Sequence, residues 1–225
     1  QSHMHFLLSK GGLYKVYNNN LLYHGCIPLN EDGSFKSVKI YGRSYKGKAL
    51  YEVLESYVRK GFYAIDEKER KRGKDMMWYI WLSENSPLFG KDKMATFERY
   101  FLAEKETHKE KKNPYYDFLE NDKVVDRILK EFGLEHSFSH IINGHMPVKS
   151  KNGENPMKCG GKVFVIDGGF SRAYQKQTGI AGYTLIYNSY GMILSAHEPF
   201  ESKESAIENE TDIHSDTIVT EIVSK

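Results

Sequence analysis

The chain has 225 residues, in which 32 lysines and arginines nearly balance 30 aspartates and glutamates, so the net charge of +2 predicts no surface for nucleic acid. Its two cysteines, Cys26 and Cys159, lie far apart without CxxC spacing, which argues against a disulfide framework and favours a reducing cytoplasm. No apolar run approaches the roughly 18 residues that a membrane span needs, and no secretory signal stands out. We therefore expect neither a nucleic-acid nor a membrane partner.

The first half of the chain predicts three strands followed by helices. Residues 1–4 read QSHM, a common cloning remnant, and we exclude them, with His3, from the search for sites. Strands are predicted over residues 12–17 and 20–24 around a polar turn, and over residues 38–41. Apolar residues at helical spacing predict a helix over residues 47–61. A second helix, over residues 66–82, ends in an aromatic cluster that we expect in the core: Trp78, Tyr79 and Trp81.

The second half is rich in predicted strands. Residues 104–113 form a charged, exposed connection, and Asn121 caps a helix that Gly133 closes. The apolar stripe of this helix is Val124, Val125, Ile128, Leu129 and Phe132. Strands are predicted over residues 138–143, 162–167, 183–188, 192–197 and 217–223. This order predicts an α/β (α+β) fold in which helices pack on one side of a mostly antiparallel or mixed sheet.

Two short apolar runs each end in a histidine beside a glycine, with a proline close behind. His24 lies in LLYHGCIP (residues 21–28), and His145 lies in IINGHMPV (residues 141–148). We interpret each as a strand that delivers an imidazole to its tip, and two such tips could supply one divalent metal. For His136 and His140 we expect surface or packing roles, and His197 is a minor candidate for lining the site.

Several motifs resemble known phosphatase families. The run Asn143-Gly144-His145, with IDGG at residues 166–169, is similar to turns of the metallophosphoesterase superfamily, and HGCIP (residues 24–28) resembles a turn of phosphoprotein phosphatases. SPLFGKDK (86–93), IDGGFSRAYQK (166–176) and TGIAGYTL (178–185) resemble the class III fructose-1,6-bisphosphatases, manganese-dependent bacterial sugar-phosphate phosphatases. The resemblance extends from about residue 12 to residue 223.

The resemblance implies a fold and an activity. The fold would be the C-terminal half of a four-layer α-β-β-α sandwich, with residues 5–200 in the catalytic domain, a helical insertion at about 44–135, and an extension at 201–225 that ends in a strand. The activity would be removal of the 1-phosphate of fructose 1,6-bisphosphate in gluconeogenesis, in the cytoplasm.

The resemblance also implies residue roles. His24 and His145 would be ligands of Mn²⁺, and Asp167 would serve the catalytic site by orienting a ligand; its alternative role is to accept hydrogen bonds from turn amides. The cations that would hold the substrate phosphates are Arg172, Lys176, Lys91 and Lys93. Any one of these four could instead be a solvated surface charge.

The chain also departs from the superfamily. The other metal ligands of that superfamily come from Asp-x-His, Gly-Asp-x-x-Asp and Gly-Asn-His motifs, yet no Gly-Asp or Gly-Asn dipeptide occurs here. Asp212-Ile213-His214 matches the first motif literally, but it follows the last family motif and we attribute it to chance. Because two-metal hydrolysis needs two bridged ions about 3.5–4 Å apart, we expect this chain alone to bind metal weakly or not at all and to be inactive.

The missing ligands indicate a truncated chain whose partner is the N-terminal half of the same protein. Loss of that half should expose apolar surface, so a homo-oligomer is also possible. Two alternatives stay open: a relative of protein phosphatases or diadenosine tetraphosphatases, and a non-catalytic binding or regulatory domain that kept the fold and lost the metals.

Overall fold

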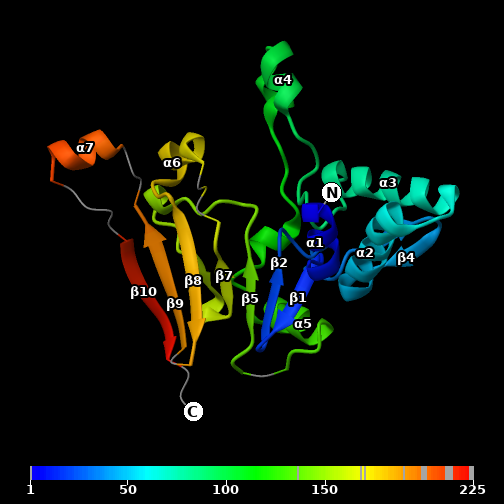
Figure 1. The fold of residues 1–225 in the computed structure, drawn as a ribbon, viewed down its shortest axis with the longest axis horizontal. Helices are drawn as coiled ribbons and strands as arrows, with labels where there is room; N and C mark the ends of the chain where they lie inside the picture. The colour runs from blue at the N-terminus through cyan, green and yellow to red at the C-terminus, as the bar shows by residue number, and fades with distance from the viewer. Residues whose placement is uncertain are drawn as a thin grey trace. The chain divides into compact units, whose positions relative to one another are not determined.

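The computed structural model describes residues 2–135, 137–167, 169, 171–189, 191–198, 202–210 and 215–222. The chain divides into two compact units, residues 1–139 and 140–225, and each is described by itself. Figure 1 labels the helices and strands of both units.

The first unit opens with a helix and a hairpin. Helix α1 (Ser2–Lys10) precedes strands β1 (Tyr14–Tyr17) and β2 (Asn20–Tyr23), which pair antiparallel with Tyr14 opposite Tyr23. Asn18 and Asn19 form the turn with φ angles of 48° and 59°, a backbone that asparagine tolerates and that matches the twist of a hairpin. The predicted hairpin is confirmed, whereas the sequence does not predict α1, whose first residues resemble a cloning remnant.

Two packed helices follow a second hairpin. Strands β3 (Val38–Ile40) and β4 (Arg43–Tyr45) pair antiparallel and lead into α2 (Gly47–Tyr63) and α3 (Glu67–Leu82). One buried cluster joins these elements: Val38, Ile40, Leu50, Leu54, Met76 and Ile80. Asp66 caps α3 by accepting a hydrogen bond from the Glu69 amide (2.8 Å). Both predicted helices are confirmed within two residues at each end.

The aromatic end of α3 does not lie where the sequence predicted. Trp78 and Trp81 are 67% and 68% exposed, and Tyr79 is half-buried. The buried face of α3 instead carries Met76 and Ile80. The prediction of a core role for both tryptophans is therefore wrong, because the helix turns them away from the face that packs against α2 and β3.

The rest of the first unit contains a projecting segment and an amphipathic helix. Helix α4 (Thr96–Phe101) and the 3₁₀ helix η1 (Lys105–His108) lie in the projecting segment, in which α4 stands at the end of two extended stretches (Figure 1). The 3₁₀ helix η2 (Pro114–Asp117) then precedes α5 (Asp122–Glu131). Asn121 caps α5 by accepting a hydrogen bond from the Val124 amide, and Gly133 follows its end with a φ of 81°. The predicted cap and stripe of α5 are confirmed.

The second unit begins with a mixed sheet. Strands β5 (His140–Asn143) and β7 (Val163–Val165) are parallel, with Asn143 beside Val165, and β6 (Met157–Lys158) pairs antiparallel with β7. Two 3₁₀ helices lie between them, η3 (Ser150–Asn152) and η4 (Cys159–Gly161), and α6 (Arg172–Thr178) follows. All residues of β5 and β7 are buried, as expected for a parallel pair.

An antiparallel meander completes the second unit. Strands β8 (Gly182–Asn188), β9 (Gly191–His197) and β10 (Ser215–Ile222) pair in the order β10-β9-β8, and α7 (Lys203–Glu208) connects the last two. The predicted strands are confirmed, and the described chain has a mixed α/β architecture with a mixed sheet. Among the described residues, no helix is long and apolar enough to cross a membrane.

Candidate functional site

The His24 turn lies directly after β2. His24 is exposed, whereas the next residues, Cys26 and Ile27, are fully buried. The structure thus confirms that a short apolar strand brings an imidazole to its exposed tip. The buried residues after it anchor the turn in the core of the first unit.

Three hydrogen bonds from residues 44–135 fix the turn that follows His24. The Cys26 amide donates a hydrogen bond to the Pro87 carbonyl (2.9 Å), and the Tyr51 hydroxyl of α2 donates to the Cys26 carbonyl (2.9 Å). Farther along, the Leu29 amide donates to Asn113 Oδ1 (3.2 Å). A Cβ on Gly25 would lie 2.5 Å from the Pro87 carbonyl oxygen, so the glycine beside His24 permits this close approach. No local sequence signal indicated these partners, because each is distant from His24 in the chain.

Buried tyrosines lie in the core beside the His24 turn. The hydroxyls of Tyr23 and Tyr115 lie 2.6 Å apart, and burial raises the pKa of both phenols. Burial likewise raises the pKa of the Cys26 thiol to about 12, so the thiol stays protonated at neutral pH. Both cysteines are free, as the sequence predicted, and both are buried.

The His145 turn lies after β5 in the second unit. His145 is half-buried and has a φ of 67°, a left-handed backbone that few side chains adopt. The residues on both sides of His145 are joined to those that follow β7. After it, the Val148 amide donates to the Asp167 carbonyl (2.7 Å), and before it, the Asn143 carbonyl accepts from the Ile166 amide (2.9 Å). The turns that carry His145 and Asp167 are therefore neighbours.

The Asp167 carboxylate accepts a hydrogen bond from the Gly169 amide (2.9 Å). This contact is the amide-acceptor role that the sequence left open, and it occupies one carboxylate oxygen. Gly168 and Phe170 lie outside the described residues. A catalytic role for Asp167 stays a prediction.

The predicted phosphate-binding cations fall into two groups. Arg172 and Lys176 stand four residues apart on α6, a spacing that places them on one helix face; Lys176 is exposed, and the Arg172 side chain lies outside the description. Lys91 and Lys93 instead make contacts within the first unit, since Lys91 Nζ donates to Glu110 (3.0 Å) and Lys93 Nζ donates to the Thr107 carbonyl (2.7 Å). Those two lysines stabilise the projecting segment.

The remaining histidines have other surroundings. His140 is buried with its ring 5.6 Å from that of Phe164, which confirms a packing role. His197 Nε2 lies 2.7 Å from the Thr184 hydroxyl across the β8–β9 pair. His136 and the Asp-x-His match at residues 212–214 lie outside the described residues.

The described side chains do not by themselves fit a metal ion. No group of three or more His, Cys, Asp or Glu side chains is placed to hold one in the part of the chain that the structure describes. His24 belongs to the first unit and His145 to the second. Their pairing at one ion stays a prediction, and further ligands would have to come from elsewhere.

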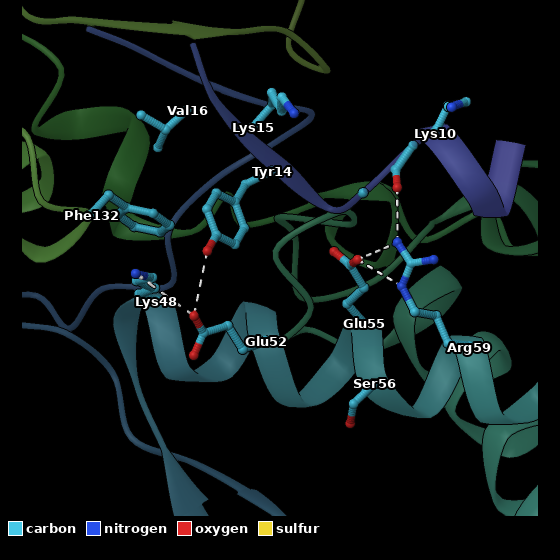
Figure 2. A pocket seen from close by; sticks show the side chains of 12 residues that line it. Lys10, Tyr14, Lys15, Val16, Lys48, Glu52, Glu55, Ser56, Arg59 and Phe132 are labelled. Atoms are coloured by element: carbon cyan, nitrogen blue, oxygen red, sulfur yellow. Dashed lines mark hydrogen bonds and ion pairs between the residues drawn. The ribbon is translucent and has the colours of Figure 1, made fainter.

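A groove of about 660 Å³ lies between α2, β1 and residues 10–12 in the first unit (Figure 2). The guanidinium of Arg59, one of its lining residues, donates to the Glu55 carboxylate and to the carbonyls of Leu8 and Gly11. The Leu13 amide also donates to Glu55 (3.0 Å). These contacts pair Arg59 and Glu55 with each other and with the backbone of residues 8–13. The two charged side chains therefore connect the start of the chain to α2.

Comparisons with known proteins agree with the motifs. The family described as Firmicute fructose-1,6-bisphosphatase matches residues 1–225. The chain is 61% identical over 226 residues to the class 3 fructose-1,6-bisphosphatase of Clostridioides difficile (strain 630), 59% over 224 residues to that of Clostridium novyi (strain NT), and 57% over 222 residues to that of Clostridium tetani (strain Massachusetts / E88). These alignments cover 98–100% of this chain and 34% of each relative.

The chain thus spans about a third of the length of the curated relatives it matches, less than the half that the motifs suggested. No solved structure matches it. The match over every residue, with identities of 57–61%, establishes the relationship. The chain belongs to the Firmicute fructose-1,6-bisphosphatase family.

Proposed function

We propose that the chain is a C-terminal portion of a fructose-1,6-bisphosphatase, and that it contributes ligands and phosphate contacts to a site that other parts of the polypeptide complete. The observation that carries this proposal is the family match over residues 1–225. The three relatives are named fructose-1,6-bisphosphatase class 3. The proposed fold is the C-terminal part of the four-layer metallophosphoesterase sandwich. The proposed location of the enzyme is the cytoplasm.

The reaction is hydrolysis of a phosphomonoester. A water oxygen bonds to phosphorus, the bond from phosphorus to the oxygen on C1 breaks, and that oxygen receives a proton, which yields inorganic phosphate and fructose 6-phosphate. The family resemblance implies Mn²⁺, which would activate the water and neutralise charge on the phosphoryl group. The imidazoles of His24 and His145 are this chain's proposed donors to it.

For substrate binding, α6 is the preferred element. Arg172 and Lys176 share one of its faces and follow the Asp167 turn, and a guanidinium suits the bidentate recognition of phosphate. Lys91 and Lys93 would first have to give up their contacts with Glu110 and the Thr107 carbonyl. We therefore place them second among the four proposed phosphate ligands.

The test is phosphate release by the full-length polypeptide with Mn²⁺ present. We expect one inorganic phosphate from each fructose 1,6-bisphosphate and none from fructose 6-phosphate, because the proposed enzyme removes only the 1-phosphate. Release from neither sugar, or equal release from both, would contradict the proposed specificity. His145→Ala should abolish the release, and Lys203→Ala, an exposed change on α7, is the matched control.

A further inference from the structure

The first unit carries an apolar surface at the end of a projecting arm, which we define as residues 90–113. Five large apolar side chains at its end form what we call the tip: Met94 (52% exposed), Phe97 (73%), Tyr100 (80%), Phe101 (78%) and Leu102 (45%). Single exposed apolar residues are ordinary, but five within nine consecutive residues form a patch of the kind that marks an interaction site.

The arm has a defined structure of its own. Its two segments pair at the base, where the Asp92 amide donates to the Lys111 carbonyl and the Asn113 amide donates to the Gly90 carbonyl, each at 2.9 Å. Above them, the Glu110 carboxylate accepts hydrogen bonds from Lys91 Nζ (3.0 Å) and the Ala95 amide (3.0 Å). These contacts join the two segments of the arm to each other and reach Ala95, next to the first residues of the tip.

The tip lies away from the core of its own unit. Figure 1 shows α4 at the far end of the two extended segments, and no residue of α4 is buried. The rings of Phe97 and Phe101 stack on each other, with centroids 6.3 Å apart. Aromatic side chains presented on an ordered support are the usual anchors of an interface.

We propose that the tip docks onto the part of the full-length polypeptide that lies outside these 225 residues. The proposal rests on the proposed function, in which this chain is one portion of a longer enzyme. The chain covers 34% of each of its relatives, so about two thirds of such a protein is available to cover the tip.

Size favours this occupant over a second copy of the chain. A stable interface between separate proteins buries about 1,200–2,000 Å² in total, whereas α4 has six residues and is therefore only about 9 Å long. A surface within the same polypeptide meets the tip at high effective concentration, so a small contact suffices. A binding partner in trans would require a larger apolar surface than the tip offers.

Site-specific photo-crosslinking of the full-length polypeptide tests this proposal. p-Benzoylphenylalanine replaces Tyr100 in one variant and Phe97 in a second, and both positions are exposed enough to accept the label without disturbing the core. The matched control replaces Ile65, which is 95% exposed in the loop between α2 and α3. After irradiation, a denaturing gel separates products by mass and peptide mapping locates the crosslinks.

We expect both arm labels to give products of monomer mass whose crosslinks reach residues outside the 225, with a yield at least fivefold above that of the Ile65 label. A product of dimer mass would assign the tip to a second copy and overturn the proposal. A crosslinking yield from the arm labels no greater than that of the Ile65 label would show that the tip is solvated, and it would overturn the proposal as well. The readout involves no catalysis, so an inactive enzyme with the expected crosslinks would refute the proposed function alone.

Discussion

At the scale of single residues, the turn that carries His24 depends on side chains far away in the sequence. Tyr51 is 1% exposed, and its hydroxyl donates a hydrogen bond to the Cys26 carbonyl. Burial raises the pKa of its phenol well above the ordinary value. The sequence predicted the histidine at a strand tip because the apolar run, the glycine and the proline are adjacent. It did not predict Tyr51 or Pro87, because their contacts with the turn exist only after folding.

Tyr51→Phe should destabilise the chain by about 1–3 kcal/mol, because a buried carbonyl loses its donor. Chemical denaturation measures the change in the free energy of unfolding. Tyr14→Phe is the matched control, since the Tyr14 hydroxyl makes only a long, exposed hydrogen bond to Glu52 (3.4 Å), and its effect should stay within about 0.5 kcal/mol. Equal effects of the two variants would mean that the Tyr51 hydroxyl does not stabilise the turn.

At the scale of elements, local patterns identified most helices and strands but not their orientation. The stripe and cap of α5 are adjacent in sequence, so they predicted that helix and its buried face. Trp78 and Trp81 show the opposite case, because an aromatic run at the end of α3 does not specify which side of the helix meets α2. The close approach of Gly61 and Gly73 sets that side: a Cβ on Gly73 would lie 2.1 Å from the Gly61 nitrogen.

Gly73→Ala should therefore destabilise the first unit. In an exposed helix this change stabilises by about 0.5–1 kcal/mol, but here the methyl group would overlap the backbone of α2, and overpacking costs about 1–3 kcal/mol or more. Lys74→Ala, an exposed change on the same helix, is the control and should be nearly neutral. A stabilised Gly73→Ala variant, measured by thermal or chemical unfolding, would show that the two helices do not approach closely.

The arm should respond to acid through Glu110. Partial burial alone would raise the pKa of this carboxyl, but hydrogen bonds from Lys91 and the Ala95 amide, with the nearby charges of Lys91 and Arg99, lower it below its usual value. A lowered pKa in the folded state stabilises the arm above the unfolded value, about 4.3, and that contribution is lost as the pH falls through the folded value.

Hydrogen exchange of the Ala95 amide, corrected for its intrinsic rate, measures this effect. Protection should stay constant from pH 6 to about 4.3 and fall as the pH decreases from there through the folded pKa of Glu110, and Glu110→Gln should remove that dependence on pH. Glu106→Gln changes an exposed carboxyl on the same arm and should leave the profile unchanged. The same profile in wild type and Glu110→Gln would exclude this carboxylate as the group that holds the arm.

At the scale of the whole molecule, the site cannot be derived from these residues alone. The motifs predicted the family, because several short turns of this chain resemble those of the class III fructose-1,6-bisphosphatases, and the comparisons confirm that assignment. The roles of His24, His145, Asp167, Arg172 and Lys176 stay predictions, because a metal site requires at least three converging donors and the described residues do not assemble them. The physical reason is that ligands of one ion come from distant parts of a polypeptide, and this chain spans about a third of its relatives.

The central claim is that these 225 residues are one portion of a fructose-1,6-bisphosphatase and do not form its active site alone. The most direct measurement compares phosphate release from fructose 1,6-bisphosphate, with Mn²⁺ present, by this chain and by the full-length polypeptide. We predict turnover in the usual range of enzymes, about 1–1,000 per second, for the full-length polypeptide and none above background for the chain. Turnover in that range by the chain alone would contradict the account, because the described residues would then suffice for catalysis.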